Sequence, residues 1–375
     1  MKNIVFLLAA ALMVLPSCAA PPRSAATASS AAVSENLAVI IADVESAASR
    51  ISAGDIGAAR TLPRDIDVLS GAIDGGKLDA HGLMVARHYR GQARYLLSSL
   101  NQALGFPADR QMAGAALADF EAVANAPGQE NAELRRDSLF YAGYVVMNEL
   151  GEPARSVTYF QRCADMKQPG CQNIIASAKI GGSIGVKKDL PGAVALHQEA
   201  YATGLDYGCS GTHSAYSLAR VAHFMGTKAE GRSALDWLRR AHRLADQAKV
   251  RAQTGDVCGG SFMSAYEYLF RLEKGERKPA LLDQVVAGIE DSQLPKPLDR
   301  MQVYLGGRSD YKAFRASIDE VRDAHSRCEY AFVGLWYAAL SNQKTAARSF
   351  REILQRDGQD TTCAENLAYS ARYLR

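Results

Sequence analysis

The sequence predicts an all-α protein in which helices pack as consecutive antiparallel pairs. Alanine is abundant, runs of β-branched residues are scarce, and apolar residues recur at helical rather than alternating spacing. The chain has 375 residues, which is enough for a large core and for more than one ordinary domain. We therefore expect an array of helices that is almost free of strands.

The clearest helix pair lies in the last fifty residues. Its first segment carries Gly334 between Tyr330 and Tyr337, and its second segment, after a polar turn, carries Ala346 and Phe350. Small residues at these places allow two antiparallel helices to cross closely, and the aromatic rings fill the space above and below. This pattern resembles the tetratricopeptide repeat. Because one such pair cannot bury its apolar face alone, the resemblance implies stacked neighbours in a right-handed α-solenoid.

Earlier segments continue the helical pattern. A helix is expected over about residues 79–104, its partner over about 111–126, and a further pair over 139–166. Residues 181–204 change character, because a glycine-rich turn precedes the second helix. They resemble the Sel1-like variety of repeat at five positions: Gly185, Val186, Asp189, Ala193 and Ala200. The resemblance implies that Sel1-like and tetratricopeptide pairs belong to one solenoid.

These observations divide the chain into six segments. We expect a signal peptide at 1–17, a lipidated cysteine and flexible tether at 18–34, amino-terminal helix pairs at 35–130, tetratricopeptide and Sel1-like repeats at 131–255, a diverged helical segment at 256–325, and a carboxy-terminal repeat with a capping helix at 326–375.

The amino terminus predicts export from the cytoplasm. Lys2 is followed by twelve apolar residues at 4–15 and then by Pro-Ser-Cys, which is typical of a secretory signal rather than a membrane span. The ending at Cys18 resembles the lipobox of bacterial lipoproteins. The resemblance implies that Cys18 is lipidated and anchors the protein to the periplasmic side of the outer membrane. Ordinary cleavage after Ala19 or Ala20 would instead give a soluble periplasmic protein.

An exported chain with an even number of cysteines is expected to form disulfides. Apart from Cys18 there are six: Cys163, Cys171, Cys209, Cys258, Cys328 and Cys363. No Cys-x-x-Cys and no histidine pair at ligand spacing occurs, so the sequence predicts neither a metal nor another cofactor.

The spacing of these cysteines suggests how they pair. A Pro-Gly turn folds the chain back between Cys163 and Cys171 and brings them within bonding reach. Cys328 and the last cysteine are 35 residues apart, which is one tetratricopeptide repeat, so the resemblance implies similar places on adjacent first helices. The pairing of Cys209 with Cys258 would follow by elimination.

The charge balance and the sequence motifs narrow the range of possible functions. The 43 basic and 40 acidic residues nearly balance, and no basic run interleaved with aromatic residues appears, which argues against nucleic acid as the partner. The single Gly-x-Ser-x-Gly match, Gly181 to Gly185, lies in a glycine-rich turn expected between two helices rather than after a strand, and no His-Glu-x-x-His motif occurs. Neither a hydrolase elbow nor a zincin helix is therefore indicated. We expect a protein without catalytic residues.

Two surfaces are candidates for binding a protein or peptide. The tetratricopeptide resemblance implies that one helix faces a concave groove with small and apolar residues, namely Ala331, Leu335, Ala338 and Ala339. On an earlier helix, Arg87, Arg90 and Arg94 fall on one face and could bind an acidic peptide, or form an ordinary solvated surface.

The leading hypothesis is therefore a lipid-anchored scaffold or adaptor for an envelope enzyme or assembly. Residues from about 295 to the end resemble the carboxy-terminal part of envelope tetratricopeptide lipoproteins. An enzyme acting on cell-wall or β-lactam substrates is the alternative, because cysteine-rich Sel1-like proteins are linked to β-lactam binding and Ser341-x-x-Lys344 matches the Ser-x-x-Lys motif. A third possibility is a structural protein whose groove is filled by its own tail.

Overall fold

A computed structural model describes residues 31–52, 55–103, 106, 109–127, 131–205, 209–252, 258–287, 296–321 and 323–373 of the chain. All regular structure within these ranges is helical, as the sequence predicts. The chain divides into two compact units, of which the first ends at Cys171 and the second begins at Gln172. This boundary falls inside the segment 131–255. Cys18, the predicted lipidation site, lies outside the described residues.

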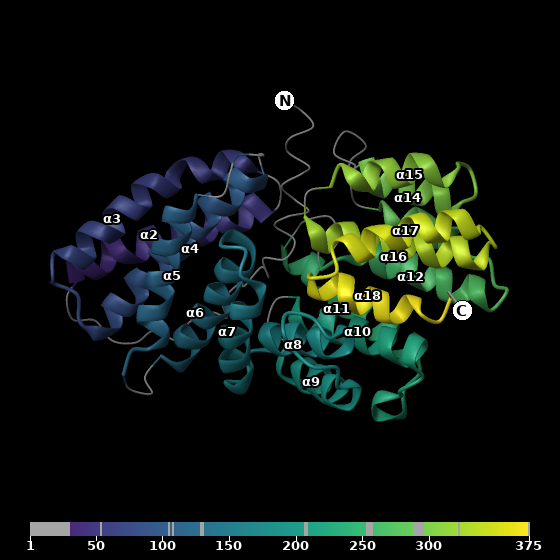
Figure 1. Ribbon diagram of the computed structural model, residues 1–375. Coiled ribbons are helices and arrows are strands. Elements are labelled where there is room, and N and C mark those ends of the chain that lie inside the picture. The colour runs from purple at the N-terminus through teal and green to yellow at the C-terminus, as the bar shows by residue number, and fades with distance from the viewer. Residues whose placement is uncertain are drawn as a thin grey trace. The chain divides into compact units, whose positions relative to one another are not determined.

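The first unit is built from helices that follow one another as neighbours (Figure 1). The longest is α4, within one residue of the helix predicted over 79–104. In chain order the elements of this unit are α2 (Ala31–Ser52), η1 (Ile56–Thr61), α3 (Leu62–Asp74), α4 (Ala80–Ala103), α5 (Arg110–Ala124), α6 (Ala132–Tyr144), the π-helical turn η2 (Val145–Glu149) and α7 (Pro153–Asp165).

The second unit repeats this arrangement with shorter helices, and its last three helices, α16 to α18, contact one another. The helix α8 (Pro169–Gly181) begins in the first unit and ends in the second. The other elements of the second unit are α9 (Leu190–Thr203), α10 (Ser210–Arg220), the π-helical turn η3 (Val221–Met225), η4 (Ala229–Gly231), α11 (Ala234–Ala252), α12 (Gly260–Glu273), α13 (Ala280–Val285), α14 (Lys296–Leu305), α15 (Tyr311–Asp319), α16 (Ala324–Leu340), α17 (Lys344–Arg356) and α18 (Thr361–Ser370).

Consecutive pairing is the rule in both units. The helices α4 and α5, α6 and α7, α10 and α11, and α16 and α17 are among the most extensive contacts in the structure. The segment 256–325, which the sequence marks as diverged, also contains paired helices, α12 with α13 and α14 with α15. The architecture is therefore an all-α array of consecutive helix pairs, consistent with a repeat protein.

Close helix crossings explain the glycines that the sequence placed in first helices. A Cβ atom on Gly334 would lie 2.7 Å from the ring of Phe350, and one on Gly143 would lie 2.5 Å from the ring of Phe160. Contacts this short are sterically forbidden, so only glycine lets each ring lie against the opposite backbone. Gly91 and Phe120 repeat the arrangement in an earlier pair.

All three predicted disulfides are confirmed. Cys163–Cys171 joins the end of α7 to the start of α8 with a Cα–Cα distance of 5.8 Å. Cys209–Cys258 and Cys328–Cys363 have Cα–Cα distances of 5.2 and 5.1 Å, and each joins regions at the amino-terminal ends of two first helices. Three disulfides indicate an oxidising location outside the cytoplasm. Among the described residues, no helix is long and apolar enough to cross a membrane.

Candidate functional site

The predicted arginine stripe on α4 is largely engaged within the protein. Nη2 of Arg90 and Nη1 of Arg94 each lie 2.6 Å from a carboxylate oxygen of Asp119 on α5, and Asp119 is buried. Arg90 also donates to the hydroxyl of Ser70. Arg87 is partly exposed on the same helix. The carboxylate that two of the three arginines bind is thus the protein's own, and the pairs fasten α4 to α5.

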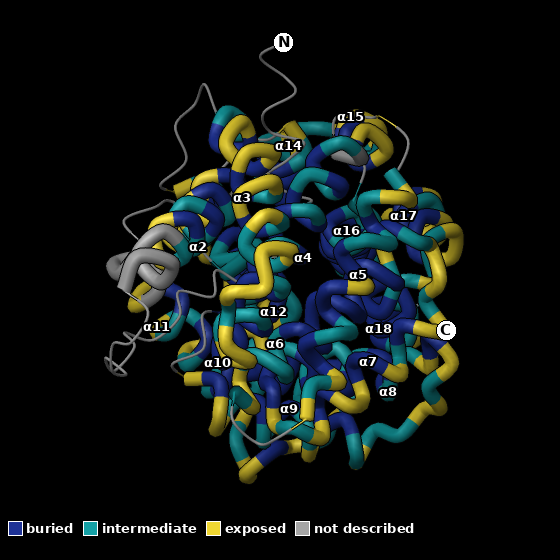
Figure 2. Tube along the Cα trace, turned by 90° about the vertical axis from the view of Figure 1, so that its left-hand side faces the viewer, coloured by how far each residue is buried: buried dark blue, intermediate teal, exposed yellow. Residues whose placement is uncertain are grey.

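The predicted groove residues lie in the core of the second unit. Ala331, Leu335 and Ala338 are fully buried, and Ala339 is partly buried. They are covered because the first helices of this unit pack against one another, with α16 in contact with both α12 and α18. Figure 2 shows this burial as dark blue along much of α16 and α18. In this conformation the four residues offer no open surface to a partner.

Ser341 and Lys344, the serine and lysine of the Ser-x-x-Lys match, lie at the turn between α16 and α17. Ser341 ends the first helix, Lys344 begins the second, and both are exposed. An acyl-transfer site needs donors arranged around a nucleophile in a pocket that excludes water. The pocket described below has neither residue in its lining.

A buried charged cluster, which the sequence did not reveal, lies at the centre of the second unit. Nη1 of Arg220, at the end of α10, lies 3.1 Å from Oε1 of Glu329 on α16, and its Nη2 lies 3.7 Å from Oε1 of Glu365 on α18. The same guanidinium donates to Asn366. Tyr266 on α12 donates to Glu329 over 3.2 Å. The cluster thereby connects four helices.

Aromatic rings surround this guanidinium. The centroids of four rings lie within 6.0 Å of its central carbon: Tyr216, Tyr266, Phe332 and Tyr369. Burial alone would lower the pKa of Arg220, but Glu365 and other neighbouring groups outweigh burial and raise it well above its usual range. Arg220 therefore stays charged in the interior. Its contacts with Glu329, Glu365 and Asn366 hold the helices together.

A second polar cluster fixes the end of the chain. Glu273, at the end of α12, lies 2.9 Å from Nε2 of His223 in η3 and accepts hydrogen bonds from Trp336, Arg372 and Tyr373. Burial alone would raise the pKa of Glu273, but the hydrogen bond from His223 and the groups at the chain end outweigh it and lower this pKa to about 2. The carboxylate is thus ionised and binds the residues that follow α18 to η3.

A pocket of about 540 Å³ lies beside α18, within the second unit. One side is formed by α18, the other by the end of α8, the glycine-rich turn after it and the end of η3. We call this pocket the α18 groove. Its lining residues are Lys179, Ile180, Gly181, Gly182, Lys188, Leu190, Met225, Gly358, Ala364, Leu367, Ala368 and Ala371. Its volume is within the range of about 300–1,000 Å³ that is usual for ligand sites.

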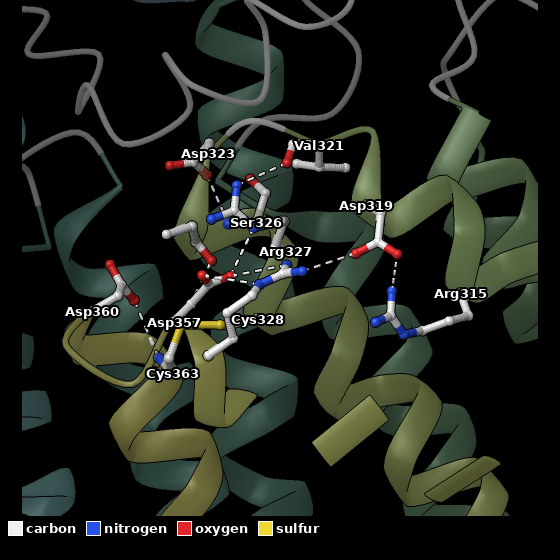
Figure 3. A network of polar contacts seen from close by, with 12 residues as sticks. Arg315, Asp319, Val321, Asp323, Ser326, Arg327, Cys328, Asp357, Asp360 and Cys363 are labelled. Atoms are coloured by element: carbon white, nitrogen blue, oxygen red, sulfur yellow. Dashed lines mark hydrogen bonds and ion pairs between the residues drawn. A yellow bond between two sulfur atoms is a disulfide. The ribbon is translucent and has the colours of Figure 1, made fainter. Parts of the chain in front are cut away.

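The α18 wall of this groove is held in place by covalent and polar contacts (Figure 3). Cys363 on α18 is bonded to Cys328 on α16. Asp360 caps α18 by accepting from the backbone N–H of Cys363 over 3.1 Å, and Asp323 caps α16 in the same way. Nε of Arg327 donates to Asp357 over 2.8 Å and so joins α16 to the turn before α18. These contacts form a rigid support for the groove.

The glycine-rich turn forms the opposite wall and explains part of the Sel1-like pattern. Asp189 accepts from the backbone N–H of Gly192 and caps α9, while also accepting from Nζ of Lys179 over 2.8 Å. Gly182 and Gly185 have φ values of +74° and +85°, which side chains rarely allow. The sequence marked this turn as a repeat feature, and the structure shows that it also borders the groove.

Two further polar clusters, in the first unit, are buried. Nδ1 of His88 lies 2.8 Å from Oγ of Ser138, the distance of a nucleophile and its base, but both side chains are buried among aromatic rings. Glu149 in η2 accepts from Ser98 and Ser99, and burial raises its pKa. No group of three potential ligand residues gathers into a metal site among the residues that the structure covers.

Comparison of the chain with protein-family models, with curated proteins and with solved structures gives no match.

Proposed function

We propose that this protein is a binding protein of the bacterial cell envelope that acts as a scaffold or adaptor and is anchored through a lipid on Cys18. The observation that carries the proposal is the α18 groove, which is lined by apolar side chains and lysines and contains no pair of groups suited to acid–base or nucleophilic chemistry. A site of this kind binds a partner without transforming it. We propose that the partner is another protein.

The covalent framework supports this role. Three disulfides join helix pairs in a chain of consecutive pairs. They restrict the unfolded chain and so stabilise the array. A protein that presents a fixed surface to a partner gains affinity when that surface is ordered before binding. The groove wall formed by α18, which one of these disulfides holds, is such a surface.

Cross-linking in intact cells tests the binding role. The full chain, with a small tag inserted between residues 19 and 34, is cross-linked, purified in its oxidised form and analysed by mass spectrometry. We expect a defined polypeptide whose purified form binds the full chain in a calorimetric titration. If no cross-linked polypeptide rebinds as a purified protein, the scaffold proposal is wrong.

The anchor is tested separately by mass spectrometry of the mature amino terminus. We expect a diacylglyceryl group on Cys18 and recovery of the protein with membranes, and release of the Cys18→Ser variant into the soluble fraction. Cleavage after Ala19 or Ala20 without lipid would show that the protein is soluble in the periplasm.

A further inference from the structure

We propose that the α18 groove binds a short apolar peptide segment of a partner protein and that a carboxylate of this segment pairs with Lys188. This inference rests on the proposed function and assigns it a site and a chemical class of ligand. The proposed binding site is thus the α18 groove, which is open to solvent in this structure, and not the arginines of α4 or the buried residues of α16.

The shape of the groove comes from small residues at its base. Ala364, Ala368 and Ala371 recur at helical spacing along α18 and just after it. Their side chains are short and leave the space above them open. Leu190 and Met225 stand on the opposite wall. Apolar side chains of a ligand placed here would be removed from water on two sides, which is the main source of affinity for such a segment.

The charges of the groove favour an anionic ligand. Nζ of Lys179 is paired with Asp189 at 2.8 Å, so its charge is already balanced. Among the described residues, no carboxylate forms an ion pair with Lys188, which lines the same groove. The groove therefore carries one positive charge that the protein does not neutralise. A ligand carboxylate at this position would form a charge-assisted hydrogen bond.

The position of Lys188 depends on the absence of a side chain at Gly182. A Cβ atom on Gly182 would lie 2.8 Å from Cγ of Lys188 and 3.0 Å from its Cε. The alkyl part of Lys188 thus lies against Gly182, although the residue as a whole is exposed. This contact restricts the side chain before a ligand arrives and reduces the conformational entropy lost on binding.

The two walls meet at a close contact that fixes the width of the groove. A Cβ atom on Gly181 would lie 2.6 Å from the backbone of Ala364, so the end of α8 and the start of α18 touch through main-chain atoms. Asn366 donates to the backbone carbonyl of Cys328 over 3.1 Å, beside the Cys328–Cys363 disulfide. The groove is therefore formed before binding.

The lining favours a peptide over an acyl chain. Gly181, Gly182 and Gly358 line the groove with main-chain atoms. The N–H groups of Gly182 and Gly358 already donate within the protein, so carbonyl oxygens are the main-chain groups that could accept from the backbone of an extended segment. The groove is also partly open to solvent. An acyl chain has no group to pair with these main-chain atoms and would remain partly in water.

Peptide display on the full, oxidised chain tests the proposal. A library of random heptapeptides is selected on the wild type and counter-selected on Ala368→Glu, which places a bulky negative group in the groove. A selected peptide is then synthesised with a fluorophore, and its affinity is measured by anisotropy for the wild type, Lys188→Gln and Lys187→Gln. Lys187 is the matched control, because it is an exposed neighbour that does not line the groove.

We expect enriched peptides to combine apolar residues with a carboxylate. Lys188→Gln should weaken binding about tenfold or more, since it removes a charge-assisted hydrogen bond, while Lys187→Gln leaves the affinity unchanged. Thermal melting of each variant confirms that it is folded.

Two results would overturn the proposal: no peptide enriched on the wild type, or equal affinity for wild type and Lys188→Gln. Binding of dodecanoate that depends on Lys188, without any enriched peptide, would identify the groove as a lipid site and also overturn it. If peptides fail while a cross-linked protein still rebinds the full chain, the scaffold role stands and its partner binds elsewhere. If both fail, the proposed function fails as well.

Discussion

Arg220 and Glu329 form a buried ion pair of 3.1 Å across 109 residues of sequence. Their side chains are 4% and 5% exposed, so the pair is almost completely removed from water. Together with Glu365 and Asn366, it joins the first helices of separate pairs at one point. The centre of the second unit is thus organised by a charge rather than by apolar contacts alone.

Removing this charge should destabilise the protein strongly. We expect Arg220→Met to lower the free energy of unfolding by about 3–5 kcal/mol, because Glu329 and Glu365 would remain buried without a counter-charge. Urea denaturation followed by circular dichroism measures the loss. Lys296→Met is the control, since Lys296 and Glu320 form an ion pair that is more than half exposed and should contribute little. Equal stability of the two variants would contradict the role given to Arg220.

The glycine–phenylalanine crossing makes a second prediction. Gly334→Ala should lower the free energy of unfolding by about 1–3 kcal/mol, because the added methyl group overlaps the ring of Phe350. Gly114→Ala on α5 is the matched control, as nothing lies within 4 Å of its Cβ position. That variant should be about 0.5–1 kcal/mol more stable than the wild type, since alanine favours a helix over glycine. The same denaturation assay compares them.

His197 should make the protein less stable in mild acid. Burial lowers the pKa of this histidine to about 4, whereas an unfolded chain gives about 6.5. Above pH 6.5 the ring is neutral in both states and has no effect on stability. As the pH falls from about 6.5 to 4, only the unfolded state gains the proton, and roughly 3 kcal/mol of stability is lost.

Denaturation at pH 7, 5.5 and 4.5 measures this loss. We expect His197→Asn to show a smaller difference between pH 7 and pH 4.5 than the wild type, even if it is less stable at both. The Asn side chain can still contact Asn173, whose Oδ1 lies 3.0 Å from Nδ1 of His197. His81→Asn, at an exposed position, should retain the pH dependence of the wild type.

The Cys328–Cys363 disulfide should stabilise both the fold and the groove wall. Replacing both cysteines with alanine should lower the free energy of unfolding by roughly 2–4 kcal/mol. If the groove binds peptides as proposed, the affinity should fall as well, because α18 loses its covalent link to α16. Replacing Cys163 and Cys171, in the first unit, should reduce stability but leave peptide affinity unchanged. Anisotropy and denaturation on the same preparations separate the two effects.

Local signals in the sequence predicted much of the fold. Gly334 and Phe350 are close in sequence and belong to one helix pair, so their spacing alone indicated a crossing that the structure confirms. Two of the disulfides were also predicted from local spacing, because a turn separates the cysteines of one and a repeat length separates those of the other. Gly91 was missed, although it lies against Phe120 in the same way, because 29 residues separate the two.

The central cluster and the groove could not be predicted in this way. Arg220 is followed by apolar residues and is typical, by itself, of a solvated helix face. Its burial depends on which helices from distant parts of the chain converge there, and one sequence carries no signal for that. The same reason explains why Ala331 and Leu335 were expected in an open groove: the tetratricopeptide resemblance indicates which positions would face a groove, but not whether another helix of this chain already covers them.

The order of the three disulfides has a consequence for how the protein is made. Six cysteines can pair in fifteen ways. Here the first, third and fifth of the six cysteines each bond to the next cysteine along the chain. No disulfide therefore encloses or crosses another. In a chain that enters an oxidising compartment amino terminus first, the correct partner of each waiting thiol is always the next thiol to arrive. For these six cysteines, oxidation in the order of their arrival would give the native pattern without reshuffling of bonds.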